Sequence, residues 1–369
     1  MGNVSDYLKW RGDLSFEQDP FNDVDNLVLS QLAYVNLKNI VPEAGTGQTI
    51  ILGTASELFF SLNSEEKLRN DKTFTREVPY LLRDAAATRR FSEVVLSNYV
   101  DEIDEHEEKQ FAAFQCGMPD GTTYIAFRGT DDTIVGWKED FNMSFMSPVP
   151  SQLHAVKYIN STVSSKAGKL RLGGHSKGGN LAIYAAVKAD KQLQRRIIEV
   201  YNNDGPGFDR NMIESEEYQQ MLPRIKTIVP YHSVVGMLLE HEEEYMVVKS
   251  NQTGIMQHDG NSWQVCGNHF LTNRKLSKES AVLKDAMSEW INSLDTEERA
   301  RFVEALFAVV TASGAKTLSD INSDIFKSAN AALKMFNSLD ADTRGMLLKL
   351  FRSFTVTLKK ARRKGVVNV

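Results

Sequence analysis

The chain has few cysteines, no long apolar run and little excess charge of either sign. Cys116 and Cys266 are the only cysteines among 369 residues, so a disulfide-stapled fold is excluded. No apolar run approaches the roughly 18 residues of a membrane-spanning helix. The formal net charge is −5, which gives no sign of a surface for nucleic acid. We therefore expect no nucleic-acid partner.

A secretory signal is also missing from the first ten residues, which have neither a positive stretch nor a continuous apolar one. We expect a cytoplasmic protein whose two cysteines are thiols. Hydrophobic residues make up 42% of the chain and charged residues 25%, as in ordinary globular proteins. At about 100 to 200 residues per domain, the length allows one large domain and a smaller appendage.

Strand and helix patterns alternate through the first three quarters of the chain. Helical spacing is predicted for 25–34, 55–69, 75–98 and 150–166, and strands for 110–116, 122–127, 197–201, 225–229 and 245–248, with a further strand just before residue 173. This order favours an α/β fold with a mainly parallel sheet covered by helices on both faces.

From residue 274 onward the chain contains helix formers and no strand pattern. The sequence Asn-Ser-Leu-Asp occurs at 292–295 and again at 337–340, where Asp295 and Asp340, or the serines beside them, are suited to begin helices as N-caps. We predict a domain over residues 1–273 and a helical appendage over 274–369. Three roles are open to this appendage: a lid, a stabiliser or a binding tail.

The chain ends in a basic stretch that includes Lys359, Lys360, Arg362, Arg363 and Lys364. We favour a solvated helix end, because cations are stabilising at a helix C-terminus. Peripheral contact with an anionic membrane surface is the alternative, since basic amphipathic helices bind there.

The run Gly174-His175-Ser176-Lys177-Gly178 carries the strongest chemical signal. It follows an apolar strand and leads into an alanine-rich helix, so it is typical of a nucleophile elbow, in which a strained turn lifts a serine hydroxyl clear of the sheet. Ser176 is therefore the candidate nucleophile. A phosphate-cradling loop is disfavoured because the glycine spacing is not that of a P-loop.

A serine needs an imidazole to accept its proton and a carboxylate to orient that imidazole. His258 lies in the loop after the last predicted strand and is our candidate base, with His269 as the alternative. His232 and His241 flank the preceding strand and are interpreted as structural. His175 is interpreted as a packed or hydrogen-bonded residue of the elbow.

The candidate acid is Asp204, which follows the strand at 197–201 and precedes a Gly-Pro-Gly turn. It could instead only stabilise that turn. Asp259 is a weaker candidate because chain neighbours seldom face each other well. Two backbone N–H groups should bind the developing oxyanion. We assign these to Lys177, next to the nucleophile, and to Thr130, whose hydroxyl could also donate.

With Phe127-Arg128-Gly129-Thr130, Trp137, Asp140 and the elbow in this order, residues 110–260 resemble the class 3 lipases of the α/β-hydrolase fold. Over about three quarters of the chain, the sequence is similar to a poorly characterised bacterial family of lipase-like hydrolases. The resemblance implies Ser176 as nucleophile, Thr130 in the oxyanion hole and His258 as base. It implies an acyl or lipid ester as substrate, with no cofactor and no metal.

The resemblance to class 3 lipases does not extend to the acid of the catalytic triad. Class 3 lipases carry it in the stretch that matches Tyr231–Val235, where this chain has Ser233. The run around Asp204 is similar to the aspartate loop of pancreatic-type lipases, so we expect a triad whose acid lies one strand earlier. Ser233 also supports a different hypothesis, a catalytically silent hydrolase fold that serves as a binding or scaffold module. A thioesterase or peptidase is a further alternative, because triad chemistry serves any acyl transfer.

Overall fold

The computed structural model describes residues 2–367 except 72, 74, 132, 166, 167, 315 and 318–324. By its internal contacts the chain forms two compact units. The first comprises Met1–Glu102, Phe111–Gly129 and Pro150–Leu276, and the second comprises Ile103–Gln110, Thr130–Val149 and Ser277–Val369. The prediction had divided the chain at residues 273 and 274 and had assigned only the C-terminal segment to the appendage.

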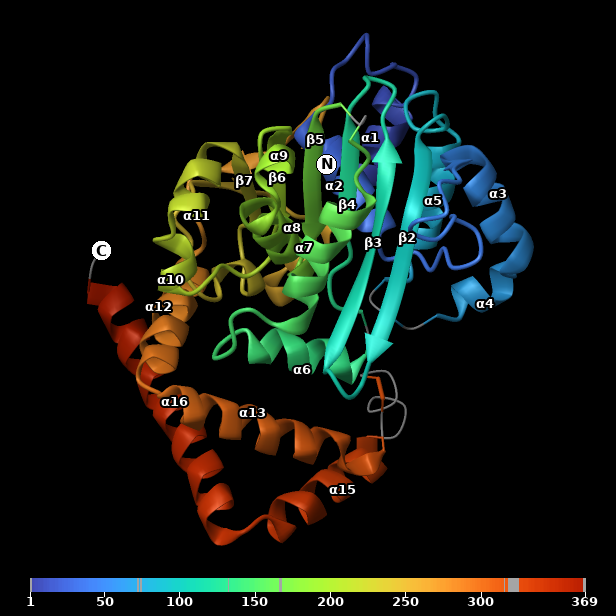
Figure 1. The fold of residues 1–369 in the computed structure, drawn as a ribbon. Coiled ribbons are helices and arrows are strands. Elements are labelled where there is room, and N and C mark those ends of the chain that lie inside the picture. Colours follow the sequence, from blue (N-terminus) through green and yellow to red (C-terminus); the bar gives the residue numbers. More distant parts are fainter. Residues whose placement is uncertain are drawn as a thin grey trace. The chain divides into compact units, whose positions relative to one another are not determined.

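A mainly parallel sheet organises the first unit (Figure 1). Strands β4 to β8 run parallel to one another, whereas β3 pairs with β4, β1 with β2 and β11 with β8 in antiparallel fashion. Along the sheet the strands follow the order β1 (Ile50–Ile51), β2 (Val95–Asp104), β3 (Lys109–Gly117), β4 (Thr123–Phe127), β5 (Leu170–His175), β6 (Ile197–Asn203), β7 (Ile225–Pro230), β8 (Tyr245–Val248) and β11 (Thr272–Asn273). A separate hairpin joins β9 (Val265–Cys266) to β10 (His269–Phe270). The predicted α/β class is confirmed.

Apolar side chains alternate between the two faces of this sheet because successive residues of a strand point to opposite sides. Ile125 and Phe127 of β4 pack in one core with α7 (Pro150–Thr162) and α8 (Lys177–Lys188). Tyr124 and Ala126 pack in the other, with α1 (Val4–Arg11), α2 (Asp23–Leu32) and α5 (Val78–Ala86). Helices therefore cover both faces, as predicted.

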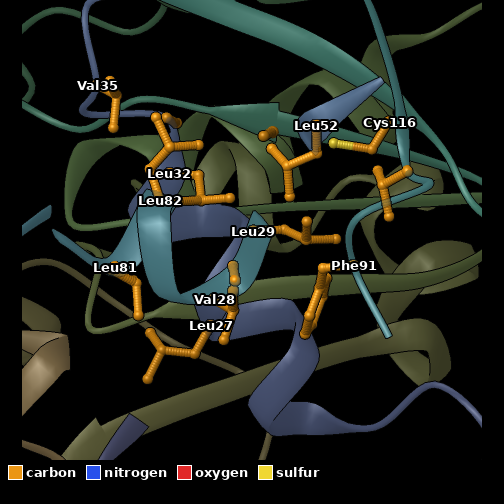
Figure 2. Close-up of a cluster of buried hydrophobic side chains, with 14 of the residues drawn as sticks. Leu27, Val28, Leu29, Leu32, Val35, Leu52, Leu81, Leu82, Phe91 and Cys116 are labelled. Atoms are coloured by element: carbon orange, nitrogen blue, oxygen red, sulfur yellow. The ribbon is translucent and has the colours of Figure 1, made fainter. Parts of the chain in front are cut away.

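Helix α2 is buried along nearly its whole length. Figure 2 shows four of its apolar side chains beside residues of α5, Phe91 and Cys116; the four are Leu27, Val28, Leu29 and Leu32. Burial raises the pKa of the Cys116 thiol, so this cysteine acts as a small apolar side chain. The helix predicted at 25–34 is therefore part of the core. A charged side chain introduced on its buried face would lower the stability of the fold.

Smaller helices complete the first unit. They are α3 (Leu52–Leu62), α4 (Glu65–Arg69), α9 (Lys191–Gln194), α10 (Arg210–Ile213) and α11 (Glu216–Met221), with 3₁₀ turns at Leu222–Arg224, Val235–Met237, Gly254–His258 and Gly260–Ser262. The segment 55–69 was predicted as one helix. It is divided because Ser64 starts a new helix as N-cap, accepting a hydrogen bond from the backbone N–H of Lys67.

The predicted helix over residues 75–98 is wrong in its second half. Helix α5 ends at Ala86, and residues from Val95 onward form β2. Leu96 of β2 pairs with Ile50 of β1. Local spacing did not reveal this strand because β propensity depends strongly on the neighbouring strands of the sheet, here β1 and β3, rather than on spacing within the strand itself.

The second unit is helical apart from the tip of the β2–β3 hairpin and a short bridge. Its helices are α6 (Ile134–Asn142), α12 (Lys278–Asn292), α13 (Thr296–Val310), α15 (Ile325–Ser338) and α16 (Ala341–Val367). Ile134 of α6 packs in one apolar cluster with Phe302 and Val303 of α13 and Leu350 of α16. This shared core explains why residues 130–149 belong to the helical unit rather than to the sheet unit.

Both repeated Asn-Ser-Leu-Asp motifs precede helices, as predicted. Asp295 caps α13, since its side chain accepts from the backbone N–H of Glu298 and the Glu298 side chain accepts from that of Asp295. Asp340 accepts from the backbone N–H of Thr343 at 2.8 Å at the start of α16. Each cap satisfies an N–H group that has no partner within its helix.

The basic end of α16 is described only in part. Lys359 and Lys360 are exposed, and Lys360 forms an ion pair with Glu289 at 2.7 Å. The side chains of Arg362, Arg363 and Lys364 lie outside the described residues. In the described part of the chain, no helix combines the length and apolar character needed to cross a bilayer. Peripheral membrane contact stays a prediction.

Candidate active site

Ser176 occupies the turn between β5, which ends at His175, and α8, which begins at Lys177. Its φ of 57° and ψ of −133° lie in a region that residues with side chains rarely adopt. The flanking glycines make the turn possible, because a methyl group on Gly174 would collide with the backbone of Gly178 and one on Gly178 with the carbonyl oxygen of Phe127. Such strain in a non-glycine residue is typical of functional sites.

His258 and Asp204 come together although 54 residues separate them in the chain. His258 ends the turn Gly254–His258, and its Nδ1 lies 2.7 Å from Asp204 Oδ2. The carboxylate can only accept, so Nδ1 carries the proton and Nε2 has the free lone pair. The Asp204 side chain is fully buried and that of His258 is 25% exposed. A buried acid thus orients an imidazole that solvent can reach.

The second carboxylate oxygen of Asp204 is also held. Ser233 Oγ donates to Asp204 Oδ1 at 2.5 Å, and the backbone N–H of Gly236 donates to the same atom at 3.2 Å. Asp204 itself has a positive φ of 54°, and its backbone N–H donates to Ile228 O at 2.8 Å. Ser233, at the position where the lipase resemblance places an acid, therefore binds the acid supplied by the previous strand.

The imidazole of His258 also lies against the elbow. Its ring centroid is 4.6 Å from that of His175, the residue before Ser176, and His175 Nε2 lies 2.7 Å from the carbonyl oxygen of His258. Among the described residues no hydrogen bond joins Ser176 Oγ to His258. Hydrogen bonds of catalytic groups often tighten only when substrate binds, so the arrangement is compatible with proton transfer between the two.

The other histidines and Asp259 have different surroundings. His269 is exposed and its Nδ1 lies 3.5 Å from Asn268 Oδ1, whereas His241 is buried against Glu243. Asp259 accepts from the backbone N–H and the side chain of Asn261, and burial raises its pKa. The backbone N–H of His232 donates to Gln257. Among the histidines that the structure describes, only His258 is hydrogen-bonded to Asp204.

The two oxyanion candidates differ in what the structure describes. Lys177 is the first residue of α8 and directly follows Ser176; its backbone N–H stays a prediction. Thr130 belongs to the second unit, and its Oγ1 donates to Asp140 Oδ2 at 2.6 Å. The suggestion that its hydroxyl also stabilises an oxyanion needs correction, because that proton is already donated to a carboxylate. The backbone N–H of Thr130 stays a prediction.

Two further residues at the site escaped sequence reasoning. Tyr34 follows α2 and its hydroxyl lies 2.9 Å from His175 Nδ1. Ser233 was taken only as a missing acid, although a hydroxyl at that position could have signalled support for a neighbouring carboxylate. No described group of three or more histidine, cysteine, aspartate or glutamate residues has a metal-binding arrangement.

Comparison with known proteins assigns a family. The model of the Mbeg1-like family matches residues 85–308, more than half of the chain. The chain belongs to the Mbeg1-like family. A search of curated proteins found no match. The bacterial origin suggested by the sequence resemblance stays a prediction.

Solved structures with some likeness to the chain include two lipases. One is a fungal lipase in complex with an inhibitor, described as a model for interfacial activation, with 15% identity, a TM-score of 0.35, and coverage of 50% of this chain and 75% of that one. The other is the M37 lipase, with 17% identity, a TM-score of 0.33, and coverage of 57% and 68%. At these TM-scores the likeness carries no argument about function.

Proposed function

We propose that this Mbeg1-like protein is a serine hydrolase of the α/β-hydrolase type that cleaves carboxylic esters. The observation that carries the proposal is the hydrogen bond between Asp204 and His258, formed beside a strained elbow that bears Ser176. A buried carboxylate, an accessible imidazole and a serine on such a turn are the three parts of a catalytic triad.

In the proposed reaction Ser176 Oγ attacks the ester carbonyl carbon while His258 Nε2 accepts the hydroxyl proton. The bond to the leaving alcohol then breaks, and His258 returns the proton to the alcohol oxygen. A water molecule, deprotonated by His258, attacks the acyl carbon; the bond to Ser176 Oγ breaks, His258 returns the proton to Oγ, and the carboxylic acid leaves. Asp204 stabilises the imidazolium during both steps, and the backbone N–H groups of Lys177 and Thr130 are the proposed oxyanion donors.

The scaffold alternative rested on Ser233 standing where an acid was expected. That support is weakened because Asp204 supplies a carboxylate to His258 and Ser233 binds this carboxylate. The proposal extends to a small-molecule or lipid ester as substrate and to a cytoplasmic location. Cys116 and Cys266 are both free thiols, which fits a reducing compartment.

The test is labelling with a fluorophosphonate, which reacts with an activated serine. We expect labelling of the full chain and none of Ser176→Ala, with Ser164→Ala as a matched serine variant that keeps labelling. A panel of nitrophenyl esters, the corresponding thioesters and anilides then separates esterase from thioesterase and peptidase. Absence of labelling and of turnover in the folded wild-type protein would favour the scaffold alternative.

A further inference from the structure

Helix α2 and the residues just after it carry a polar stripe within an otherwise apolar core. Asn26, Ser30 and Tyr34 are spaced four residues apart, which places them on one face of a helix. The backbone N–H of Tyr34 still donates to Gln31 O in a turn that follows α2. Buried polar side chains are costly unless they are hydrogen-bonded, so the partners of this stripe indicate what it does.

Asn26 and Ser30 both bind Asn203, at the end of β6. Asn26 Nδ2 donates to Asn203 Oδ1 at 2.9 Å, and Asn203 Nδ2 lies 3.1 Å from Ser30 Oγ and 3.0 Å from Gly174 O. The carbonyl oxygen of Asn203 accepts the backbone N–H of Ser176 at 2.9 Å. All of these side chains except that of Ser176 are essentially inaccessible. The stripe therefore supports the backbone of the elbow.

Tyr34 reaches the other side of the elbow through His175. The His258 carbonyl can only accept, so the 2.7 Å contact with His175 Nε2 requires a proton on Nε2. Burial, and secondarily the nearby His258, lower the pKa of His175 well below its usual value. The ring is neutral, Nδ1 has a lone pair, and Tyr34 Oη donates to it at 2.9 Å. The His258 carbonyl thus selects the Nε2–H tautomer, and the Tyr34 hydroxyl satisfies the Nδ1 lone pair of that tautomer.

The space around this hydroxyl is tightly restricted. A methyl group on Gly129 would collide with Tyr34 Oη and with the carbonyl oxygen of His175, and would lie 3.1 Å from Ser176 Cβ. Tyr34 also forms an edge contact with the His175 ring, whose centroid is 5.8 Å away. The contact is therefore part of the packing around the nucleophile.

We propose that Tyr34 is a positioning residue for His258, acting by holding the His175 ring in place, and that α2 supports the elbow from below. The inference rests on the proposed function for its kinetic consequence but not for the hydrogen bond itself. Residues 1–84, which include Tyr34, precede the segment matched by the family model. Without the hydroxyl, the buried Nδ1 lone pair of His175 loses its donor, so the ring is held less firmly against the His258 carbonyl and the Gly254–His258 turn loosens.

The first test compares Tyr34→Phe with Tyr158→Phe. Tyr158 Oη donates to the Asn98 carbonyl at 2.7 Å, so both variants lose one hydroxyl from the first unit, but only Tyr34 touches His175. For a nitrophenyl ester we expect Tyr34→Phe to lower kcat about 10–100-fold, because a buried acceptor left without its donor costs about 1–3 kcal/mol, with KM within about twofold. Tyr158→Phe should lower the melting temperature and leave kcat unchanged.

A second pair of variants tests the donor to the His258 carbonyl directly. His175→Gln keeps a side-chain N–H that can donate to the His258 carbonyl, so it should retain more activity than His175→Leu. Equal loss in both variants at equal melting temperature would show that the donor is irrelevant. Equal kcat for Tyr34→Phe and wild type would likewise overturn the proposal.

The readout that does not depend on turnover is ¹⁵N NMR of the His175 ring. We expect the Nε2–H tautomer in the wild-type protein and, in Tyr34→Phe, a shift of the Nδ1 resonance that marks the loss of its hydrogen bond, with faster exchange of the Nε2–H proton. Wild-type protein with this tautomer but no ester turnover would contradict the proposed function and leave the positioning contact standing. An Nδ1–H tautomer in the wild type would refute the contact whatever the activity.

Discussion

Two histidine–carboxylate pairs in the first unit have the same local chemistry and opposite surroundings. His258 lies 2.7 Å from Asp204, and His241 Nδ1 lies 2.9 Å from Glu243 Oε1. The His258 side chain is 25% exposed, whereas the side chains of His241 and Glu243 are each 2% exposed. Glu243 also accepts from Thr227 Oγ1 at 2.5 Å and from Tyr218 Oη at 2.7 Å.

The two histidines differ in the surroundings of the second ring nitrogen, Nε2. His258 is hydrogen-bonded at Nδ1, while its ring lies against the elbow and is open to solvent. In the described part of the chain, His241 Nε2 is buried without a hydrogen-bond partner. A carboxylate that orients a histidine therefore does not define a catalytic base, because the imidazole must also have access to a nucleophile.

The largest expected effect is on turnover, which should depend on His258 and not on His241. Ser176→Ala and His258→Ala should each reduce kcat by on the order of 10⁶, since triad members act as a unit. His241→Ala should instead lower the melting temperature and keep kcat within about threefold. The measurement is turnover of a nitrophenyl ester alongside thermal unfolding of each variant. Near-normal turnover in His258→Ala together with loss in His269→Ala would assign the base to His269.

Of the two carboxylates, Asp204 and Glu243, only Asp204 should be needed for turnover. Its replacement should have a somewhat smaller effect than the loss of Ser176 or His258. Asp204→Asn should lower kcat by about 10⁴, by analogy with a serine protease triad in which the same change leaves the wrong tautomer. Thermal unfolding checks that the variant is folded, and kcat at saturating substrate gives the effect. A decrease below tenfold would show that His258 takes its orientation from another group.

Replacing a member of the buried His241–Glu243 pair should change the free energy of unfolding rather than turnover. Hydrogen bonds from His241, Thr227 and Tyr218, with the charge of His241, outweigh burial and lower the pKa of Glu243 from 4.5 to about 2. A lowered carboxyl pKa stabilises the fold above about pH 4.5, and this stabilisation disappears as the pH falls toward 2. At roughly 1.4 kcal/mol per pKa unit, it amounts to roughly 3 kcal/mol.

Glu243→Gln should therefore unfold more easily than wild type in urea at pH 7, and the difference should shrink below pH 4.5. Its kcat should stay close to the wild-type value. A gap in unfolding free energy that is constant from pH 7 to pH 3 would show that the charge of Glu243 does not stabilise the fold.

The smallest expected effect concerns the hydroxyl that supports Asp204. Ser233→Ala removes one donor to the catalytic carboxylate and leaves the N–H of Gly236 in place. A hydrogen bond to a charged group contributes about 1.5–3 kcal/mol, so we expect a decrease in kcat of about tenfold to a hundredfold. Ser233→Thr keeps the hydroxyl and should recover most of the activity. Failure of threonine to do better than alanine would assign Ser233 a packing role.

Local sequence was sufficient for some features and insufficient for others. The elbow at Ser176, the helix predicted over 150–166 and observed over Pro150–Thr162, and the strand at 245–248 follow from glycine spacing and apolar periodicity, which act within a few residues. Residues 95–98, which begin β2, were placed in the predicted helix because pairing with β1 and β3 is set by the sheet. The structure groups α6 with the helical unit because Ile134 joins a core formed mostly by residues beyond 277, and no local pattern at residue 274 reveals that core.

The sequence by itself determined the chemistry that could occur: a serine on a strained turn, a downstream aspartate and histidine, and helices capped by Asp295 and Asp340. These depend on short-range backbone constraints, which any fold of this chain must satisfy. Only the tertiary structure decided which histidine meets Asp204, why Ser233 is a partner rather than a missing acid, and how Tyr34 reaches His175. Those contacts join residues 29 to 141 positions apart, and such distances in sequence are closed only by packing of the whole sheet.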